Sequence, residues 1–454
     1  MISAKVFLCL FLIIETLFNA FEFGTMSPVE LLLVLYEMGA MSSNLTLAHP
    51  KVQEIMYSGE KFDAVVVEIF NNDAISGLAQ HFNCPLIGVT TFGAVKWANE
   101  MTGNQSPFSY VPHPFLSFTD KMSFKERMYN TLMSVVENIG FEFSYIPQQT
   151  KIYNNFFPKA TKSFKEVLRN PAIVLINSHV SSSSPRPYLP NMIEIGGIHV
   201  DAVKDLPTDL KDYLDSAKDG LIYFSMGSIV RATDWPLEKR EAFIKSLGKL
   251  KQKVLWKYEN ETLPGKTSNI KISSWLPQRD ILAHPNVKVF ITHGGLLGTT
   301  EALVEGVPVL GIPIFGDQKM NMAKAVARGY GLQINYDDIS EELITEKLTE
   351  LLSNPSYDEH AKEISKRFSD RPLTPQKAAS FWIEYAIRHK GADHLKASGN
   401  SLNFFQFHVI DVYATLIILA LILLFINLFI IKKIATKLFT KSTPKSTKKK
   451  SKLN

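Results

Sequence analysis

The stretch that decides the fold runs from Phe290 to Gln318 and reads FITHGGLLGTTEALVEGVPVLGIPIFGDQ. The apolar run at its start predicts a buried parallel strand, which ends at the glycine-rich turn after His293. A helix from about Leu296 to Val304 follows, and a second apolar strand comes after it. The glycines let the backbone approach a ligand closely. The free N–H groups at the start of the helix favour an anion, and a diphosphate suits this place.

The composition indicates a globular chain with a basic tail. At 454 residues two domains are expected, and 46% hydrophobic residues allow substantial cores. Residues 432–454 hold nine lysines and no acid, which leaves 40 basic and 44 acidic residues elsewhere, a net charge of −4. This mildly acidic balance argues against nucleic-acid binding. The two cysteines, Cys9 and Cys84, form no disulfide framework if Cys9 lies in a removed leader.

An apolar segment near the C-terminus indicates a membrane anchor. Residues 412–431 are uncharged, with an acid before them and two lysines after them, and they match the hydrocarbon core of a bilayer. We assign a transmembrane helix to residues 409–431, and the positive-inside rule puts the tail 432–454 in the cytosol and the rest in the lumen. Lys450 and Lys452 have the spacing of a retrieval signal. We expect a single-pass type I protein of the endoplasmic reticulum membrane.

The N-terminus carries a weak signal-peptide pattern over residues 1–20. Lys5 precedes the apolar run 6–14 as in a secretory leader, whereas Phe18 is large for a position near the cleavage site. A lumenal glycoprotein would accept glycans at the sequons that begin at Asn44, Asn104 and Asn260.

Strands that alternate with helices predict two Rossmann-like domains. Residues 64–68 and 85–89 are β-rich runs around a helix-like segment, which makes one βαβ unit in a domain over residues 21–200. A second series begins at residues 221–225 in a domain over residues 201–400. This alternation predicts an α/β fold with parallel sheets covered on both faces, and a cleft between the domains.

The Phe290–Gln318 stretch closely resembles the signature of the UDP-glycosyltransferases, the family of UDP-glucuronosyl- and UDP-glucosyltransferases. The spacing from His293 to the final Asp-Gln pair fits the family throughout. Phe224-Ser-Met-Gly-Ser228 and Trp275-Leu-Pro-Gln278 resemble two further family elements. The resemblance implies the GT-B arrangement, which is α/β with two Rossmann-like domains, here with the first one incomplete, plus a C-terminal transmembrane helix.

The resemblance also implies a UDP-sugar site in the second domain. In it Trp275 would stack on uracil, Glu301 would hold the ribose hydroxyls, and His293 would bond the diphosphate as negative charge grows on the leaving UDP. The Asp-Gln pair would read the donor sugar. No metal and no cofactor is implied, because the UDP-sugar is itself the donor substrate. The implied UDP-sugar ligands are Ser225, Gly227, Ser228, Trp275, Gln278, His293, Gly295, Gly298, Thr299, Glu301, Asp317 and Gln318.

The reaction implied by the resemblance transfers glucose or glucuronate from a UDP-sugar to a hydroxyl of a small lipophilic acceptor, with inversion, as in detoxification. Vertebrate members usually have Asn where this chain has Leu297, so the phosphate contact would rest on the backbone around Gly298 and Thr299. The form with Leu resembles invertebrate members, which mainly use UDP-glucose, so both donors stay open. A homo- or hetero-oligomer also stays open.

The general base is the part of this chemistry that we do not find in the sequence. In the family a His takes the proton of the acceptor and an acid orients that His. Residues 61–68, KFDAVVVE, match the segment of the acid and put Glu68 in its place. No His matches the base, and the match begins near Thr25, so ~60–90 residues of the family pattern are unmatched.

Two interpretations follow from the unmatched base. The chain is an N-terminally shortened transferase, and whether it is active without this His stays open, or it is a truncated form that binds UDP-sugar or regulates a partner without transferring. A nicotinamide-dependent enzyme is disfavoured, because no Gly-x-Gly-x-x-Gly opens either domain. Phe92, Trp97 and Phe108 are candidates for the lining of the acceptor pocket, although core packing is the commoner role of such aromatics.

Overall fold

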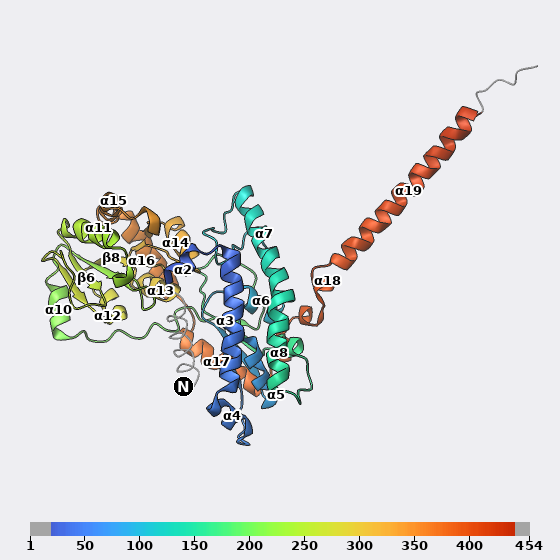
Figure 1. The fold of residues 1–454 in the computed structure, drawn as a ribbon, viewed down its shortest axis with the longest axis horizontal. Coiled ribbons are helices and arrows are strands. Elements are labelled where there is room, and N and C mark those ends of the chain that lie inside the picture. The colour runs from blue at the N-terminus through green and yellow to red at the C-terminus, as the bar shows by residue number, and fades with distance from the viewer. Residues whose placement is uncertain (1–19, 441–454) are drawn as a thin grey trace, which may run out of the picture. The chain divides into compact units, whose positions relative to one another are not determined.

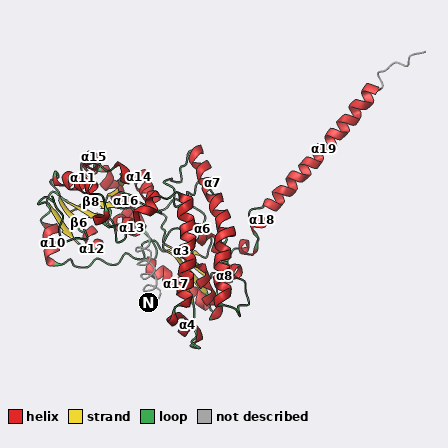
Figure 2. Cartoon of the chain, viewed as in Figure 1, coloured by secondary structure: helices red, strands yellow, loops and turns green. Residues whose placement is uncertain are grey.

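The computed structural model describes residues 20–440, so residues 1–19 of the predicted leader 1–20 and the predicted retrieval signal lie outside the described residues. Of the described residues, those up to 397 form one compact unit and those from 398 onward form another (Figure 1). Within the first unit the strands gather into two sheets enclosed by helices (Figure 2). This arrangement confirms the predicted α/β fold with two Rossmann-like domains.

The first domain is built on a parallel sheet of four strands in the order β1-β2-β3-β4. The central strand β3 reads Ile-Val-Leu-Ile and is buried at every position, as expected for a parallel strand that is covered on both faces. Strand β1 forms an edge of the sheet, and the Val66 side chain on it is 55% exposed. The strands are β1 (Val65–Glu68), β2 (Leu86–Thr90), β3 (Ile173–Ile176) and β4 (Met192–Glu194).

Helices cover both faces of the first sheet. On one face α3 begins with a capping box between Ser27 and Glu30, which supplies acceptors for its first free N–H groups, and it lies beside α7 (Figure 1). On the other face Ala379 and Ala386 of α17 pack against the sheet. The chain thus returns to the first domain after completing the second. The helical elements of this domain are α3 (Pro28–Ala48), α4 (Pro50–Tyr57), η1 (Asp73–Ser76), α5 (Gly77–His81), α6 (Lys96–Thr102), α7 (Phe124–Gly140), η2 (Phe141–Tyr145), α8 (Ile146–Phe156), α9 (Phe164–Leu168) and α17 (Pro375–Arg388). The preceding α2 (Ala20–Thr25) packs against the second domain through Phe21.

The second domain has a parallel sheet of six strands in the order β10-β9-β8-β5-β6-β7. Its strands are β5 (Leu221–Ser225), β6 (Lys253–Lys257), β7 (Ile270–Ser273), β8 (Val287–Thr292), β9 (Val309–Gly311) and β10 (Gly331–Gln333). Separate apolar clusters lie on its two faces. The helices are α10 (Thr208–Asp215), η3 (Ala232–Asp234), α11 (Leu237–Gly248), α12 (Gln278–Leu282), α13 (Leu296–Glu305), α14 (Gln318–Ala327), η4 (Tyr336–Asp338), α15 (Glu341–Ser353) and α16 (Ser356–Ser369).

The C-terminal unit contains the helix that the sequence predicts as a membrane span. Two described helices are long and apolar enough to cross a bilayer. In α3 39% of the apolar window is buried, as in the core helix of a soluble domain, whereas in α19 (Ile410–Thr440) none of it is buried. Of the two, α19 is therefore the candidate span. The remaining short elements are η5 (Asp393–Leu395), η6 (Ser398–Ser401) and α18 (Phe404–Phe407).

One predicted glycosylation site is incompatible with the fold. Asn44 and Asn260 are exposed. Asn104 is buried, and its amide donates hydrogen bonds to the Asn99 side chain and to the Pro187 carbonyl oxygen. The prediction of a glycan at Asn104 is therefore wrong for the folded chain.

Gly39 lies where α3 packs against the turn after β1. A Cβ at this position would come within 1.9 Å of the Asn71 carbonyl oxygen. Gly39→Ala should therefore lower the free energy of unfolding by about 1–3 kcal/mol or more, as overpacking does, which urea unfolding measures. Gly93→Ala is the matched control, because nothing lies within 4 Å of its Cβ position. Equal losses in the two variants would contradict this packing.

Candidate functional site

A cavity of about 1390 Å³ lies between the two domains, at the carboxyl ends of β5 and β8. These strands are neighbours in the sheet. From β5 the chain continues to β6 and β7 on one side, and from β8 it continues to β9 and β10 on the other side. Open α/β sheets bind ligands at such a switch point. All of the predicted UDP-sugar ligands except Thr299 line the cavity, and so does Glu68.

His293 follows β8 and is enclosed by two glycines. A Cβ at Gly227 would come within 2.7 Å of the imidazole, and a Cβ at Gly295 within 2.4 Å. Neither position accommodates a larger residue without displacing the ring. Burial lowers the pKa of His293 to about 4, so the imidazole is neutral near pH 7. His293 can therefore offer a hydrogen bond to a ligand but no positive charge.

The start of α13 supplies backbone donors beside His293. The N–H of Thr299 donates to the Gly295 carbonyl oxygen at 3.0 Å, and its hydroxyl donates to the same oxygen at 2.9 Å. Thr299 is thus occupied within its own helix. The preceding N–H groups, from Leu296 to Gly298, have no partner within the first turn, as at every helix start. They remain available for an anion in the cavity.

A hydrogen-bonded chain of three side chains orients Glu301. The Tyr223 hydroxyl on β5 donates to Gln278 Oε1 at 3.3 Å, and Gln278 Nε2 donates to Glu301 Oε2 at 2.5 Å. One carboxylate oxygen of Glu301 is thereby held, which leaves the other for a ligand. The sequence did not indicate a role for Tyr223, because its position is that of an ordinary apolar residue in a buried strand.

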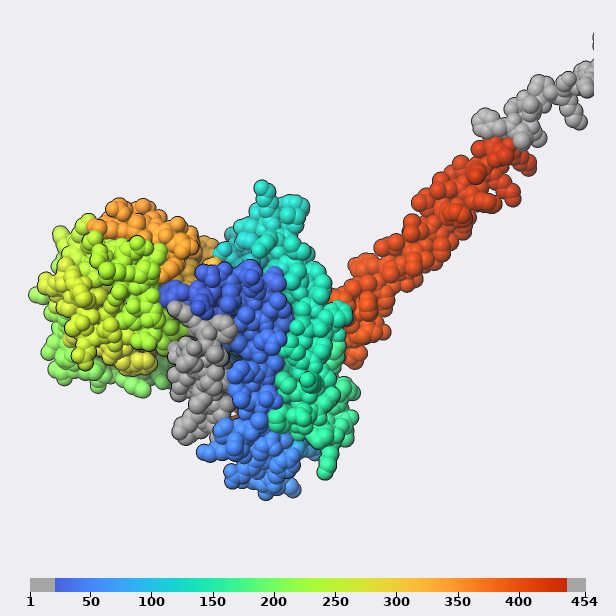
Figure 3. Space-filling view, in the orientation of Figure 1, coloured from blue at the N-terminus to red at the C-terminus, as the bar shows by residue number. Residues whose placement is uncertain are grey.

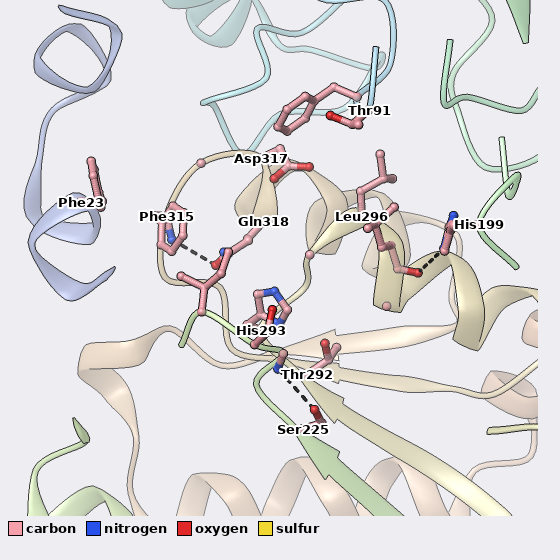
Figure 4. A pocket seen from close by; sticks show the side chains of 18 of the residues that line it. Phe23, Thr91, His199, Ser225, Thr292, His293, Leu296, Phe315, Asp317 and Gln318 are labelled. Atoms are coloured by element: carbon pink, nitrogen blue, oxygen red, sulfur yellow. Dashed lines mark hydrogen bonds between the residues drawn. The ribbon is translucent and has the colours of Figure 1, made fainter. Parts of the chain in front are cut away.

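The two residues of the Asp-Gln pair at the end of the signature, Asp317 and Gln318, make different hydrogen bonds. Gln318 Oε1 accepts from the Ile314 and Phe315 N–H groups at 2.8 and 3.1 Å, so its carbonyl shapes the preceding loop (Figure 4). Asp317 accepts from Asn321 Nδ2 at 2.9 Å, and Asn321 also donates to the Gly294 carbonyl oxygen at 3.0 Å. Burial raises the pKa of Asp317. Asn321, which ties the two turns together, also escaped our sequence reasoning.

The first strand of the domain and the Trp275 segment complete the second-domain side of the cavity. Ser225 is buried, and its hydroxyl accepts from the Gly227 N–H at 3.3 Å (Figure 4), whereas Ser228 is exposed. The Trp275 side chain is 74% exposed. An indole this open at the rim of a cavity leaves a face on which a flat ring can stack.

On the first-domain side, Glu68 at the end of β1 lines the cavity. The Thr91 hydroxyl donates to Glu68 Oε1 at 3.1 Å, and burial raises the pKa of Glu68. Of the aromatics proposed for the acceptor pocket, Phe92 and Trp97 line the cavity and Phe108 does not. The apolar residues that the first domain contributes to the cavity include Leu31, Leu35, Met38, Phe70, Phe92 and Phe115.

The segment after residue 20 also borders the cavity, which the sequence did not predict. Phe21 lies 5.1 Å from Tyr336 between ring centroids, and Phe23 lies 5.8 Å from Phe315. Figure 3 shows this blue segment against the surface of the second domain. His199 lines the cavity as well, with Nε2 at 3.2 Å from the Leu297 carbonyl oxygen (Figure 4).

The fit of His293 between its two glycines can be tested with a matched pair of variants. Gly227 and Gly265 have nearly the same φ, 80° and 78°, so an alanine is equally strained at both. Only Gly227 faces the imidazole, since nothing lies within 4 Å of the Gly265 Cβ position. Gly227→Ala should weaken UDP binding by about tenfold or more, and Gly265→Ala should leave it unchanged. Calorimetric titration with UDP measures both, and equal affinities would contradict the proposed role of this contact.

Comparisons with known proteins agree with this geometry. The sequence profile of the family described as UDP-glucoronosyl and UDP-glucosyl transferase matches residues 36–449. UDP-glycosyltransferase UGT5 of Dactylopius coccus is 42% identical over 369 residues, which are 81% of this chain and 70% of the relative. UDP-glucuronosyltransferase 2A2 of Homo sapiens is 32% identical over 86% of this chain and 72% of the relative. The solved structure of CalG4, the calicheamicin glycosyltransferase, has the same fold with a TM-score of 0.54 and 16% identity, over 78% of this chain and 82% of that one.

Proposed function

The chain belongs to the UDP-glucoronosyl and UDP-glucosyl transferase family, and from this premise we propose that it is a membrane-anchored transferase of glucose or glucuronate. The acceptor is a small lipophilic molecule with a hydroxyl group. One observation carries the proposal: the donor-site residues of the second domain line the same cavity as Glu68 and a set of apolar residues of the first domain. Donor and acceptor can therefore meet within one cavity.

The donor half matches the parts of a UDP-sugar. Trp275 offers its exposed face to uracil, and the free oxygen of Glu301 is placed for a ribose hydroxyl. The diphosphate is met by the start of α13 and by the neutral imidazole of His293. Hydrogen bonds from such preorganised dipoles stabilise the charge that grows on the departing UDP. Asp317 faces the sugar end of the donor.

The acceptor half supports attack by a hydroxyl with inversion. The acceptor oxygen forms a bond to the anomeric carbon while the bond from that carbon to the phosphate oxygen breaks, and UDP leaves with the electron pair. The hydroxyl proton passes to the Glu68 carboxylate, which lies in the cavity with Thr91 as its hydrogen-bond donor. Burial raises the pKa of Glu68, which makes it a stronger base than an exposed glutamate.

A second candidate is a protein that binds UDP-sugar without transferring it. The observation in its favour is that, within residues 20–440, the histidines that line the cavity are His199 and His293, both from the region after the first sheet. His293 belongs to the donor side, and His199 is engaged with a backbone carbonyl. This candidate predicts donor binding without turnover.

The location that we propose is the endoplasmic reticulum membrane, with both α/β domains in the lumen. Helix α19 is the candidate span, and lysines follow its apolar part. The positive-inside rule then puts the chain before α19 on the lumenal side. Exposed sequons at Asn44 and Asn260 are compatible with that side.

Donor binding is the first test of the proposed function. UDP in large excess should raise the melting temperature of the full chain in detergent by several degrees, because it binds only the folded state. Trp275→Ala and His293→Ala should each remove most of this shift. Trp275→Phe keeps an aromatic face and should retain most of it. A folded chain that shows no shift with UDP would refute the donor site.

Turnover is the second test, and it separates the two candidates. Wild-type chain with radiolabelled UDP-glucose or UDP-glucuronate and a small phenol should form glycoside, and Glu68→Gln should lower kcat by about 10²–10⁴-fold, the usual contribution of a general base. The UDP-induced shift in melting temperature should persist in this variant. Because the base acts when ionised, kcat should fall as the pH drops through the raised pKa of Glu68. Donor binding without any glycoside would favour the second candidate.

A further inference from the structure

The short helix α2 lines the cavity and packs on the second domain. Its Phe21 ring lies on Tyr336, with 5.1 Å between the ring centroids. Its Phe23 ring lies on Phe315 at 5.8 Å (Figure 4). Two residues separate α2 from α3, which is part of the apolar core of the first domain. The helix therefore connects the second domain, on which it packs, to the first domain, into which the chain continues.

The surface beneath α2 is itself well ordered. Lys239 Nζ lies 4.5 Å from the centroid of the Tyr336 ring and donates to the Tyr336 carbonyl oxygen at 2.6 Å. A Cβ at Gly24 would come within 3.0 Å of the Ile314 carbonyl oxygen. The backbone of α2 thus lies directly against the segment that follows β9, and a larger residue at Gly24 would push the two apart.

The loop on which α2 packs is the one that carries Asp317. In this loop the Phe315 N–H donates to Gln318 Oε1 at 3.1 Å. The loop turns at Gly316, which has a φ of 65°, and nothing lies within 4 Å of the Cβ position there. Packing does not brace the backbone on that side of Gly316, so the course of the loop depends on the groups before and after it. Phe23 supplies one of these contacts through the Phe315 ring.

The two rings of α2 have different surroundings. Phe21 packs against the apolar core of the second domain, whereas Phe23 meets Phe315 where both side chains line the cavity. Phe21 thus accounts for the attachment of α2, and Phe23 accounts for its contact with the donor site. The family resemblance does not supply this contact, because the profile matches residues 36–449 and α2 precedes them.

We propose that α2 positions the donor sugar: Phe21 attaches the helix to the second domain, and Phe23 holds the loop of Phe315 and Asp317 in the conformation that receives the sugar. This role rests on the donor site of the proposed function. A loop that is in place before the sugar arrives needs no ordering on binding, which strengthens the binding. Since α3 lines the first-domain side of the same cavity, α2 also connects that side to the loop that faces the sugar.

Calorimetric titration of the full chain in detergent tests this role with two ligands. They are UDP and a UDP-sugar, either UDP-glucose or UDP-glucuronate, whichever the wild-type chain binds more tightly. Phe23→Ala should weaken the UDP-sugar by about three- to tenfold, the usual contribution of an aromatic pair, and should leave UDP within about twofold of wild type. Phe23→Tyr keeps the ring and should restore the affinity. Phe143→Ala, at a side chain that is 78% exposed, is the matched control and should change neither.

A double variant shows whether Phe23 acts through Phe315. Phe315→Ala should also weaken the UDP-sugar, and Phe23→Ala should add no further loss to it, because residues in contact are not additive. Equal losses for UDP and the UDP-sugar would show that α2 supports the domain as a whole and would overturn the proposal. A Phe23→Ala chain that binds both ligands as wild type does would also overturn it. A wild-type chain that binds neither ligand would refute the donor site itself, and the role of α2 with it.

Two further measurements keep the comparison sound. Phe23 follows the predicted leader 1–20, so intact mass spectrometry is needed to confirm that all variants begin at the same residue. Thermal unfolding in a single cooperative transition confirms that each variant is folded. If Phe23→Ala does not fold, Phe23→Leu keeps an apolar side chain without the ring, and it should show the same loss that is confined to the UDP-sugar.

Discussion

The proposed donor site depends on the close approach of two backbone turns to the His293 imidazole. Gly227 comes from the turn after β5 and Gly295 from the turn after β8, and neither leaves room for a Cβ against the ring. This contact is formed only because β5 and β8 are neighbours at the middle of the sheet. The strand order therefore brings both turns to the imidazole. The size of the imidazole then sets the distance between the two turns, and with it the space that is left for a diphosphate beside the start of α13.

Hydrogen bonds between elements extend this arrangement to the rest of the donor site. Asn321 connects α14 to the glycine turn, and the chain from Tyr223 through Gln278 to Glu301 connects β5, α12 and α13. The His293 imidazole stays neutral because it is buried. The site thus presents oriented dipoles that are in place before the donor arrives, and such preorganised groups need no rearrangement as charge develops on the leaving group.

The sequence was sufficient to predict elements that depend on neighbouring residues. It was insufficient for features that depend on contacts between distant parts of the chain. The strands β5 and β8 and the helix α13 follow from apolar runs and glycines within the Phe290–Gln318 stretch and its neighbours, and their prediction is confirmed. Strands β4 and β7 were not predicted, because each is short and has no apolar run of its own. In α7, likewise, the periodicity of the sequence does not show which face of the helix is buried. That is decided by His113, which meets Glu137 from another part of the chain.

The environment of Glu68 depends both on its own strand and on a residue that is distant in the sequence. It ends an edge strand, and its one hydrogen-bond donor in the described part of the chain, Thr91, comes from the loop after β2 on the inner side. The carboxylate is consequently desolvated by the cavity wall without being neutralised by a cation, and this combination raises its pKa. A glutamate also reaches one methylene further than an aspartate from the same backbone position. Direct transfer of the acceptor proton to Glu68 therefore requires no group beyond those that line the cavity, and this is why the proposed mechanism passes through it.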